Sequence, residues 1–179
     1  MNKKEAKAKV DALLGAGVGK TAVYQLLRGK GVRDSVLAYC IASHVDAAQV
    51  DEHAAKIDRL LWIMYASSLL GVWTGWGLAA TFGPLGKGVI LLLCAGLPLF
   101  FAWGFYKNLV GFYNAFLVLQ VVQLPKVFND FNAQPVTTLV VAAINVAVLA
   151  YVAYVRHKLF PDFVTLSPKK LSGRYVFMT

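Results

Sequence analysis

The run VILLLCAGLPLFFAWGFYKNLVGFYNAFLVLQVVQL, residues 89–124, holds 36 residues and one formal charge, at Lys107. Because a helix rises about 1.5 Å per residue, this run is too long for one crossing of a hydrocarbon core about 30 Å thick. Its only strongly polar interruption is Lys107–Asn108. The run therefore predicts two transmembrane helices, about 89–106 and 109–124, with a tight turn between them.

Two more uncharged runs flank this pair, at about 60–80 and 136–155, and each is long enough to span a bilayer. The formally charged residues between positions 60 and 155 are Lys87, Lys107, Lys126 and Asp130. A long uncharged middle with charged ends is typical of a set of membrane spans. The sequence predicts an all-α protein with a four-helix transmembrane bundle, residues 60–158, whose first span is an uncleaved anchor.

Residues 1–59 are more polar, and glycine-containing runs at 15–19 and 28–31 divide them. Apolar positions recur three and four residues apart, which favours helix over strand. We predict a small cytosolic helical module. Its size makes it marginal as an independent fold, so it needs contact with the membrane domain or with a second copy to fold stably. Residues 159–179 are predicted to form a basic cytosolic tail.

The distribution of lysine and arginine predicts the orientation. The N-terminal region carries ten, the C-terminal end five and the Lys107 turn one, whereas the two remaining loops carry one each, Lys87 and Lys126. Positive residues concentrate on the cytoplasmic side. Only an even number of spans places both rich ends there, so we predict four spans with cytoplasmic termini. The net charge of +9 then indicates contact with anionic lipid of the cytosolic leaflet, and no nucleic acid is expected.

Small residues on one helix face predict helix-packing faces. Gly71, Gly75 and Ala79 form one stripe at steps of four, and Ala143, Ala147 and Ala150 form a similar stripe at steps of four and three. Such stripes let helices approach closely in lipid, within one chain or between copies, and the spacing leaves both open. Asn145 lies near mid-depth, where an amide needs a partner. Helix–helix hydrogen bonding and pore lining are both open for it.

Polar lining is predicted in the third span, at Asn114, Gln120 and Gln123. No acid or histidine lies inside any predicted span, which argues against a coupled transporter. A narrow pore built by several copies stays open.

Several motifs fail on spacing or context. The run 15–21, GAGVGKT, lacks the first glycine of a phosphate loop, since Leu14 stands there. Residues 10–32 resemble the start of a helix-turn-helix, but the next helix turns apolar. Cys40 and His44 are four apart, yet a zinc site needs four ligands. We expect no metal, no cofactor and no disulfide, and we find no constellation typical of a catalytic site.

The segment Tyr154–Phe163, YVRHKLFPDF, resembles a closing motif of small, uncharacterised bacterial inner-membrane proteins with four spans. The stretch Phe101–Asn114, with its Gly-Phe-Tyr repeats, also resembles these proteins. The resemblance covers about a quarter of the chain. It implies a bacterial plasma membrane and brings no catalytic residues. Read physically, Tyr154–Phe163 is a cationic stop, two interfacial phenylalanines and a helix-ending proline.

The leading functional hypothesis is a non-enzymatic integral inner-membrane protein that acts by self-assembly or through a protein partner bound by residues 1–59. Sensor, scaffold, immunity and defence components all fit this description. The alternative is a small oligomeric channel or permease for ions or small solutes, lined by the amides named above.

Overall fold

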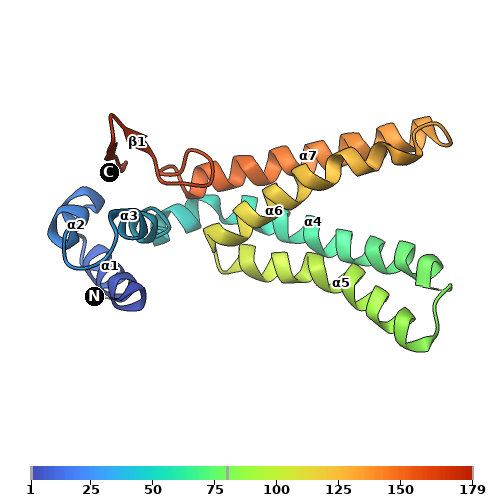
Figure 1. Cartoon of the computed structure of the whole chain (residues 1–179), viewed down its shortest axis with the longest axis horizontal. Helices are drawn as coiled ribbons and strands as arrows, with labels where there is room; N and C mark the ends of the chain where they lie inside the picture. Colours follow the sequence, from blue (N-terminus) through green and yellow to red (C-terminus); the bar gives the residue numbers. More distant parts are fainter. Residues whose placement is uncertain (1, 80, 179) are drawn as a thin grey trace. The chain divides into compact units, whose positions relative to one another are not determined.

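A computed structural model describes residues 2–79 and 81–178, and helix dominates them. The expectation of an all-α protein is confirmed. The helices, in chain order, are α1 (Lys3–Gly15), α2 (Lys20–Leu27), α3 (Asp34–Ala42), α4 (Ala47–Ala79), α5 (Pro84–Tyr106), α6 (Val110–Gln123), the 3-10 helix η1 (Leu124–Asp130) and α7 (Pro135–Leu159) (Figure 1). One short hairpin follows, from β1 (Lys170–Leu171) and β2 (Arg174–Tyr175).

The chain divides into two compact units. The first combines residues 1–51 with residues 156–179, so it contains both ends of the chain, and we call it the terminal unit. The second, residues 52–155, contains most of α4 and α7 with all of α5, α6 and η1, and we call it the membrane unit. The tail that the sequence predicted as a separate segment therefore belongs to the same unit as the N-terminal helices.

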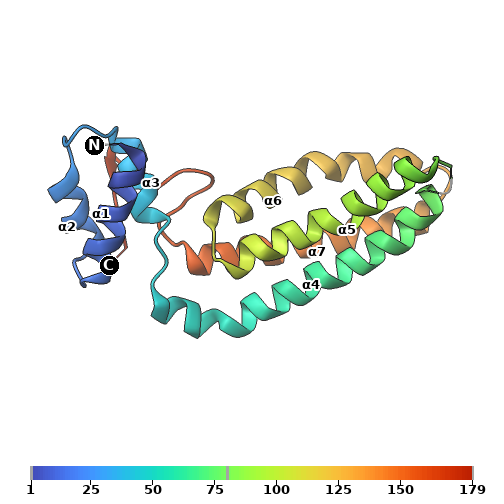
Figure 2. The same cartoon turned by 90° about the horizontal axis from the view of Figure 1, so that it is seen from below.

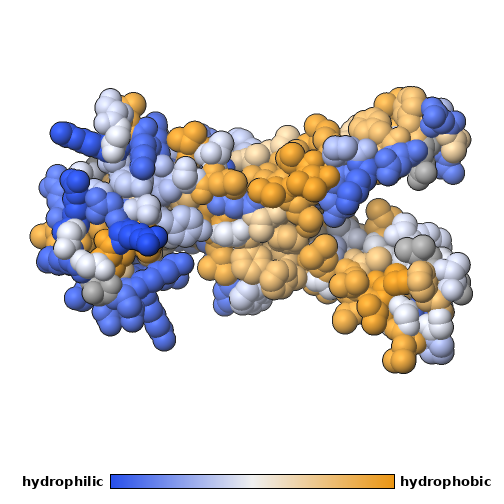
Figure 3. Space-filling view, in the orientation of Figure 1, coloured by the Kyte–Doolittle hydropathy of each residue, from blue (hydrophilic) through white to orange (hydrophobic). Residues whose placement is uncertain are grey.

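In Figure 1 the four helices of the membrane unit form two pairs, α4 with α5 and α6 with α7, which diverge toward the C-terminal end of α4, and Figure 2 shows the same helices from below. Its surface is largely apolar (Figure 3), and side chains such as Trp73 (81% exposed) and Leu69 (74% exposed) point outward from α4. Exposed apolar surface on this scale is unusual for a soluble protein and suits a lipid environment.

Three helical stretches of the described residues are long and apolar enough to cross a membrane, namely 84–106, 110–129 and 135–159. The predicted first span, 60–80, is not among them. Its residues 60–79 lie in the C-terminal part of α4, a single helix of 33 residues that contains no proline, and residue 80 lies outside the described residues. Tryptophan, serine and glycine lower the mean hydropathy of this part, although it carries no charge.

The α5–α6 break falls at residues 107–109, the place of the predicted turn. Asn108 adopts a left-handed backbone with φ 51°, which asparagine tolerates better than most residues. A Cβ on Gly104 would overlap the Phe112 ring, so glycine permits close packing beside the turn. Phe101 packs edge-on against Phe116, with ring centroids 5.2 Å apart, and the two helices are held together by aromatic contacts.

In the terminal unit, α1 begins with a capping box in which the Glu5 amide donates to Asn2 Oδ1 (2.9 Å) and the Asn2 amide to Glu5 Oε2 (3.2 Å). Glycines at positive φ, Gly17 and Gly29, end α1 and α2. The buried core of the three helices is small: Ala6, Val10, Val23, Leu27, Leu37, Ala38, Cys40, Ile41 and Ala42.

Candidate functional site

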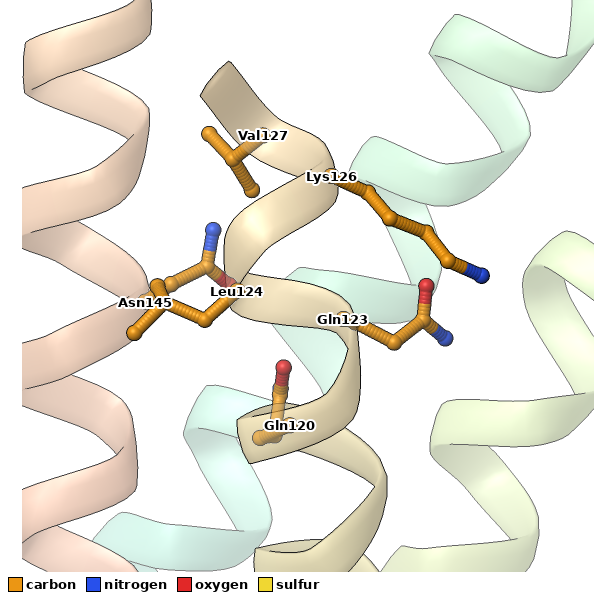
Figure 4. Close-up of a pocket in the computed structure, with 6 residues that line it drawn as sticks. All are labelled: Gln120, Gln123, Leu124, Lys126, Val127 and Asn145. Carbon is orange, nitrogen blue, oxygen red and sulfur yellow. The ribbon is translucent and has the colours of Figure 1, made fainter. Parts of the chain in front are cut away.

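Two cavities in the membrane unit share the lining residues Gln120, Gln123 and Asn145. One, of about 390 Å³, is lined by side chains from α4, α5, α6 and α7. The other, of about 370 Å³, lies between the end of α6, η1 and α7 (Figure 4). Because they share three amides, we treat them as one site and call it the amide cleft.

Local sequence places the glutamines at the end of α6. Gln120 and Gln123 are three residues apart, which puts them on one helix face. Pro125 follows inside η1, whose tighter winding places Lys126 on the cleft as well. Figure 4 shows the Gln123 and Lys126 side chains projecting to the same side of this segment, with Asn145 reaching the cleft from the neighbouring α7.

The amide cleft is apolar on most of its walls. Met64, Pro98, Phe101 and Phe116 line it from three helices, and none of its described lining residues is acidic or a histidine. Lys126 is its one formally charged lining residue among those described. An apolar cavity with a few converging polar groups is the usual form of a small-molecule binding site.

The polar side chains of the cleft differ in whether they have hydrogen-bond partners. Ser67 Oγ donates to Ile63 O (2.8 Å), Thr74 Oγ1 to Leu70 O (3.0 Å) and Asn145 Nδ2 to Val141 O (3.0 Å), so each bonds a carbonyl of its own helix.

By contrast, no hydrogen bond of the Gln120 or Gln123 side chain occurs within the described part of the chain. These two amides are available to water or to a bound molecule.

Asn114, which the sequence grouped with the two glutamines, does not line either cavity. Its Oδ1 atom is buried and lacks a hydrogen-bond partner among the described residues. The structure therefore brings Gln120 and Gln123 together with Asn145 and leaves Asn114 apart. Helix spacing explains this, because Asn114 is six residues before Gln120 and so faces another direction.

The Gly71 and Gly75 stripe packs within the chain. A Cβ on Gly71 would lie 2.5 Å from Cys94 O, and one on Gly75 would lie 3.0 Å from Cys94 Sγ. Ser68 Oγ donates to Ala95 O of α5 (2.9 Å), and Ala79 is fully buried. Gly71, Gly75 and Ser68 therefore contact α5 within the chain.

The second stripe is placed differently. Ala143, Ala147 and Ala150 are all exposed on α7, whereas the neighbouring Ala142 is buried. Among the described residues, no helix of the same chain covers this stripe. Its small side chains leave room for a helix from outside the chain.

Outside the membrane unit, the glycine-rich run 15–19 lines a hollow of about 750 Å³ together with Lys20, His44 and Met178. Lys20 Nζ is already paired with Asp162 Oδ2 at 2.7 Å, and His44 Nδ1 lies 3.1 Å from Asp11 Oδ1. No group of three or more metal-ligating side chains occurs among residues 2–79 and 81–178.

Cys40 is a buried thiol of the terminal unit. Burial raises the pKa of Cys40 above its usual value, and the nearby Lys3 and Lys7 only partly oppose this. A raised pKa leaves less thiolate, the nucleophilic form, at neutral pH. The cysteine is thus placed as a small apolar core residue.

Sequence reasoning missed the contacts of the tail. Asp162 is 1% exposed, pairs with Lys20 and accepts a hydrogen bond from the Met178 amide (2.6 Å). Tyr24 packs against Phe177, with ring centroids 5.7 Å apart, and Tyr39 meets Phe163 edge-on at 5.5 Å. The tail therefore contacts α2 and α3 and adds buried side chains to their core.

Comparison of the chain with family models, curated proteins and solved structures gives no match to any of them. Functional inference therefore depends on the geometry above.

Proposed function

We propose that the chain is an integral membrane protein with four spans and both ends on the cytoplasmic side. The observation that supports an even number is the terminal unit, in which α2 and the tail are joined through the Lys20–Asp162 pair. Three spans would separate these segments by a bilayer. The C-terminal part of α4, uncharged and rich in exposed apolar side chains, is the fourth span.

Charge supports the cytoplasmic assignment. The terminal unit carries thirteen lysines and arginines against six acids, a net +7, while the membrane unit has five against three. The positive-inside bias places such a unit in the cytoplasm, where anionic headgroups attract it. The resemblance of Tyr154–Phe163 to bacterial inner-membrane proteins adds the bacterial plasma membrane to this proposal.

Cysteine labelling in intact cells tests the topology. In a background with Cys40 and Cys94 replaced by alanine, an impermeant maleimide added outside should modify Leu85→Cys, since Leu85 is 88% exposed beside the predicted outer loop. Lys4→Cys, exposed on α1, should react only after the cells are opened. Outside labelling of Lys4→Cys would contradict the orientation, and an unlabelled Leu85→Cys would contradict the span count.

For activity, we propose a non-enzymatic role carried out by association with a second copy or a protein partner. The exposed stripe Ala143, Ala147 and Ala150 supports this most directly, because the other small-residue stripe is used within the chain. Lipid gives helices no hydrophobic reason to associate, so close contact between small side chains must supply the attraction. The basic terminal unit would hold such an assembly against the inner leaflet.

Cross-linking of the full chain in vesicles tests association. The double substitution Ala143→Leu and Ala147→Leu should reduce the cross-linked oligomer, because leucine keeps a second helix from approaching. Ala66→Leu is a matched control, since Ala66 is exposed on α4 away from this stripe. Equal oligomer yields for the double variant and the control would count against assembly through α7.

A second candidate, a channel or permease for ions or small solutes, is favoured by one specific observation. Gln120 and Gln123, whose amides have no hydrogen-bond partner among the described residues, line the cleft, as polar groups along a water path would. Flux of ions and small solutes from vesicles decides this candidate. Leakage no greater than that of protein-free vesicles would remove it.

A further inference from the structure

The amide cleft combines features that together favour one class of ligand. Its walls at Met64, Phe101 and Phe116 are apolar, and its two polar amides without partners, Gln120 and Gln123, lie together near η1. The two cavities, about 390 and 370 Å³, each fall within the size range of small-molecule pockets, roughly 300–1,000 Å³.

An empty cleft of this kind would be costly in a bilayer. An amide that meets hydrocarbon without a hydrogen-bond partner is destabilised, because its transfer from water to an apolar medium is unfavourable. Water alone would satisfy Gln120 and Gln123 but would also wet the aromatic wall beside them. An occupant with a polar end and an apolar end satisfies both parts of the cleft.

The charge of the cleft lining indicates the chemistry of the ligand's polar end. Lys126 extends beside Gln123 in Figure 4, and the described lining contains no carboxylate to neutralise it. A lysine ammonium donates three hydrogen bonds and accepts none, while the amide groups donate through nitrogen. The complementary head is therefore an anion rich in acceptor oxygens, such as a phosphate diester.

We propose that the amide cleft binds an anionic phospholipid, with one acyl chain against Phe101 and Phe116 and the phosphate near Lys126 and Gln123. The bilayer itself supplies this ligand at high local concentration. The site is a lipid site of the membrane unit and differs from the general attraction of the basic terminal unit for headgroups. It rests on the proposed embedding of the chain in a membrane.

Native mass spectrometry of the full chain tests the selectivity. The protein is released from detergent micelles doped with equal amounts of phosphatidylglycerol and phosphatidylcholine that have identical acyl chains. The wild type should retain phosphatidylglycerol preferentially. Lys126→Met should reduce that preference on the order of tenfold, the usual size of one lost charged hydrogen bond.

Lys87→Met is the matched control, because Lys87 lies over the Trp76 ring (3.8 Å to its centroid) and does not line the cleft. It should keep the preference. Leu119→Trp, which fills the larger cavity, should lower retention of both lipids. Equal losses for the two lysine variants would overturn the proposal, since general surface charge would then explain binding. No preference in the wild type would overturn it as well.

A second measurement does not require the lysine variants to fold. A bimane label on Thr74→Cys, in the background without native cysteines, reports the cleft, while one on Leu69→Cys reports the outer face of the same helix. Phosphatidylglycerol with brominated chains should quench the Thr74 label more than brominated phosphatidylcholine does, and the Leu69 label equally. Equal quenching at Thr74, or exclusion of lipid there by a second copy, would overturn the proposal. Cysteine labelling tests the topology independently of the lipid measurements. A failure of the lipid proposal can therefore be distinguished from a failure of the proposed membrane embedding.

Discussion

Replacing Asp162 by asparagine should open the terminal unit. The Asp162 carboxylate is 1% exposed, and one oxygen binds Lys20 Nζ at 2.7 Å while the other accepts from the Met178 amide at 2.6 Å. These two contacts join α2 to the last residues of the tail. The substitution removes the charge but keeps the size, so its effect reports the ion pair and not a cavity.

The expected magnitude follows from the exposure of the two partners. Removing one member of a fully buried pair costs about 3–5 kcal/mol, because the other charge stays buried without compensation. Lys20 is 17% exposed and can regain some water, and asparagine can still accept from the Met178 amide. We therefore expect a loss of about 1–3 kcal/mol in the free energy of opening the tail.

Hydrogen exchange of the full chain in lipid nanodiscs measures this loss. Peptides from residues 164–178 and from α2 should exchange faster together, by about fivefold or more. Arg28→Met is the control, because the Arg28–Asp34 pair is 64% and 41% exposed and should matter little. A loss below about 0.5 kcal/mol, the level of an exposed pair, would refute the reasoning. So would strict additivity with Lys20→Met, since paired residues must couple.

Three further outcomes are expected. Gly71→Leu should lower the unfolding temperature in detergent, because overpacking against Cys94 costs roughly 1–3 kcal/mol. Gly77→Leu is the control and should leave the unfolding temperature unchanged, because a Cβ there meets nothing within 4 Å; equal melting of the two variants would contradict the α4–α5 contact. Cys40 should alkylate far more slowly in the folded chain than in urea at pH 8, because its raised pKa and its burial limit the reactive thiolate; equal rates would contradict its placement. Because the pKa of the Cys40 thiol is raised, the free energy of unfolding should be constant below about pH 9, the usual thiol pKa, and should fall above it, where the unfolded chain loses the thiol proton before the folded chain does. Cys40→Ala should make this fall smaller when the free energy of unfolding is measured by denaturant titration at several pH values.

The sequence was informative where the signal is local. Long uncharged runs and the polar pair Lys107–Asn108 predicted α5, α6 and α7 with ends within five residues of those observed, since hydrophobic length and a turn residue act within one segment, whereas α4 begins at Ala47, well before the predicted start of the first span at residue 60. The hairpin was missed, although Ser172 and Gly173, with φ 49° and 80°, carry a Ser-Gly turn signal. Helix α4 runs without a proline from Ala47 to Ala79, across the predicted boundary at residue 59 between the N-terminal module and the first span.

The sequence alone could not predict which residues far apart in the chain contact one another. Asp162 and Lys20 are 142 residues apart, and nothing in either neighbourhood specifies the other. The same holds for the amide cleft. Spacing placed Gln120 and Gln123 on one face of α6, but only the packing of α7 brings Asn145 to that face and turns Asn114 elsewhere.

The discontinuous terminal unit sets an order for biosynthesis. The partners of Tyr24 and Lys20 are Phe177 and Asp162, and Asp162 is made 142 residues after Lys20, so α2 must wait for that later segment before its surface is covered. Contacts between distant parts of a chain form late, because loop closure has to precede them. Every nascent chain therefore passes through a stage with an uncapped N-terminal module, and a truncated product would remain in it.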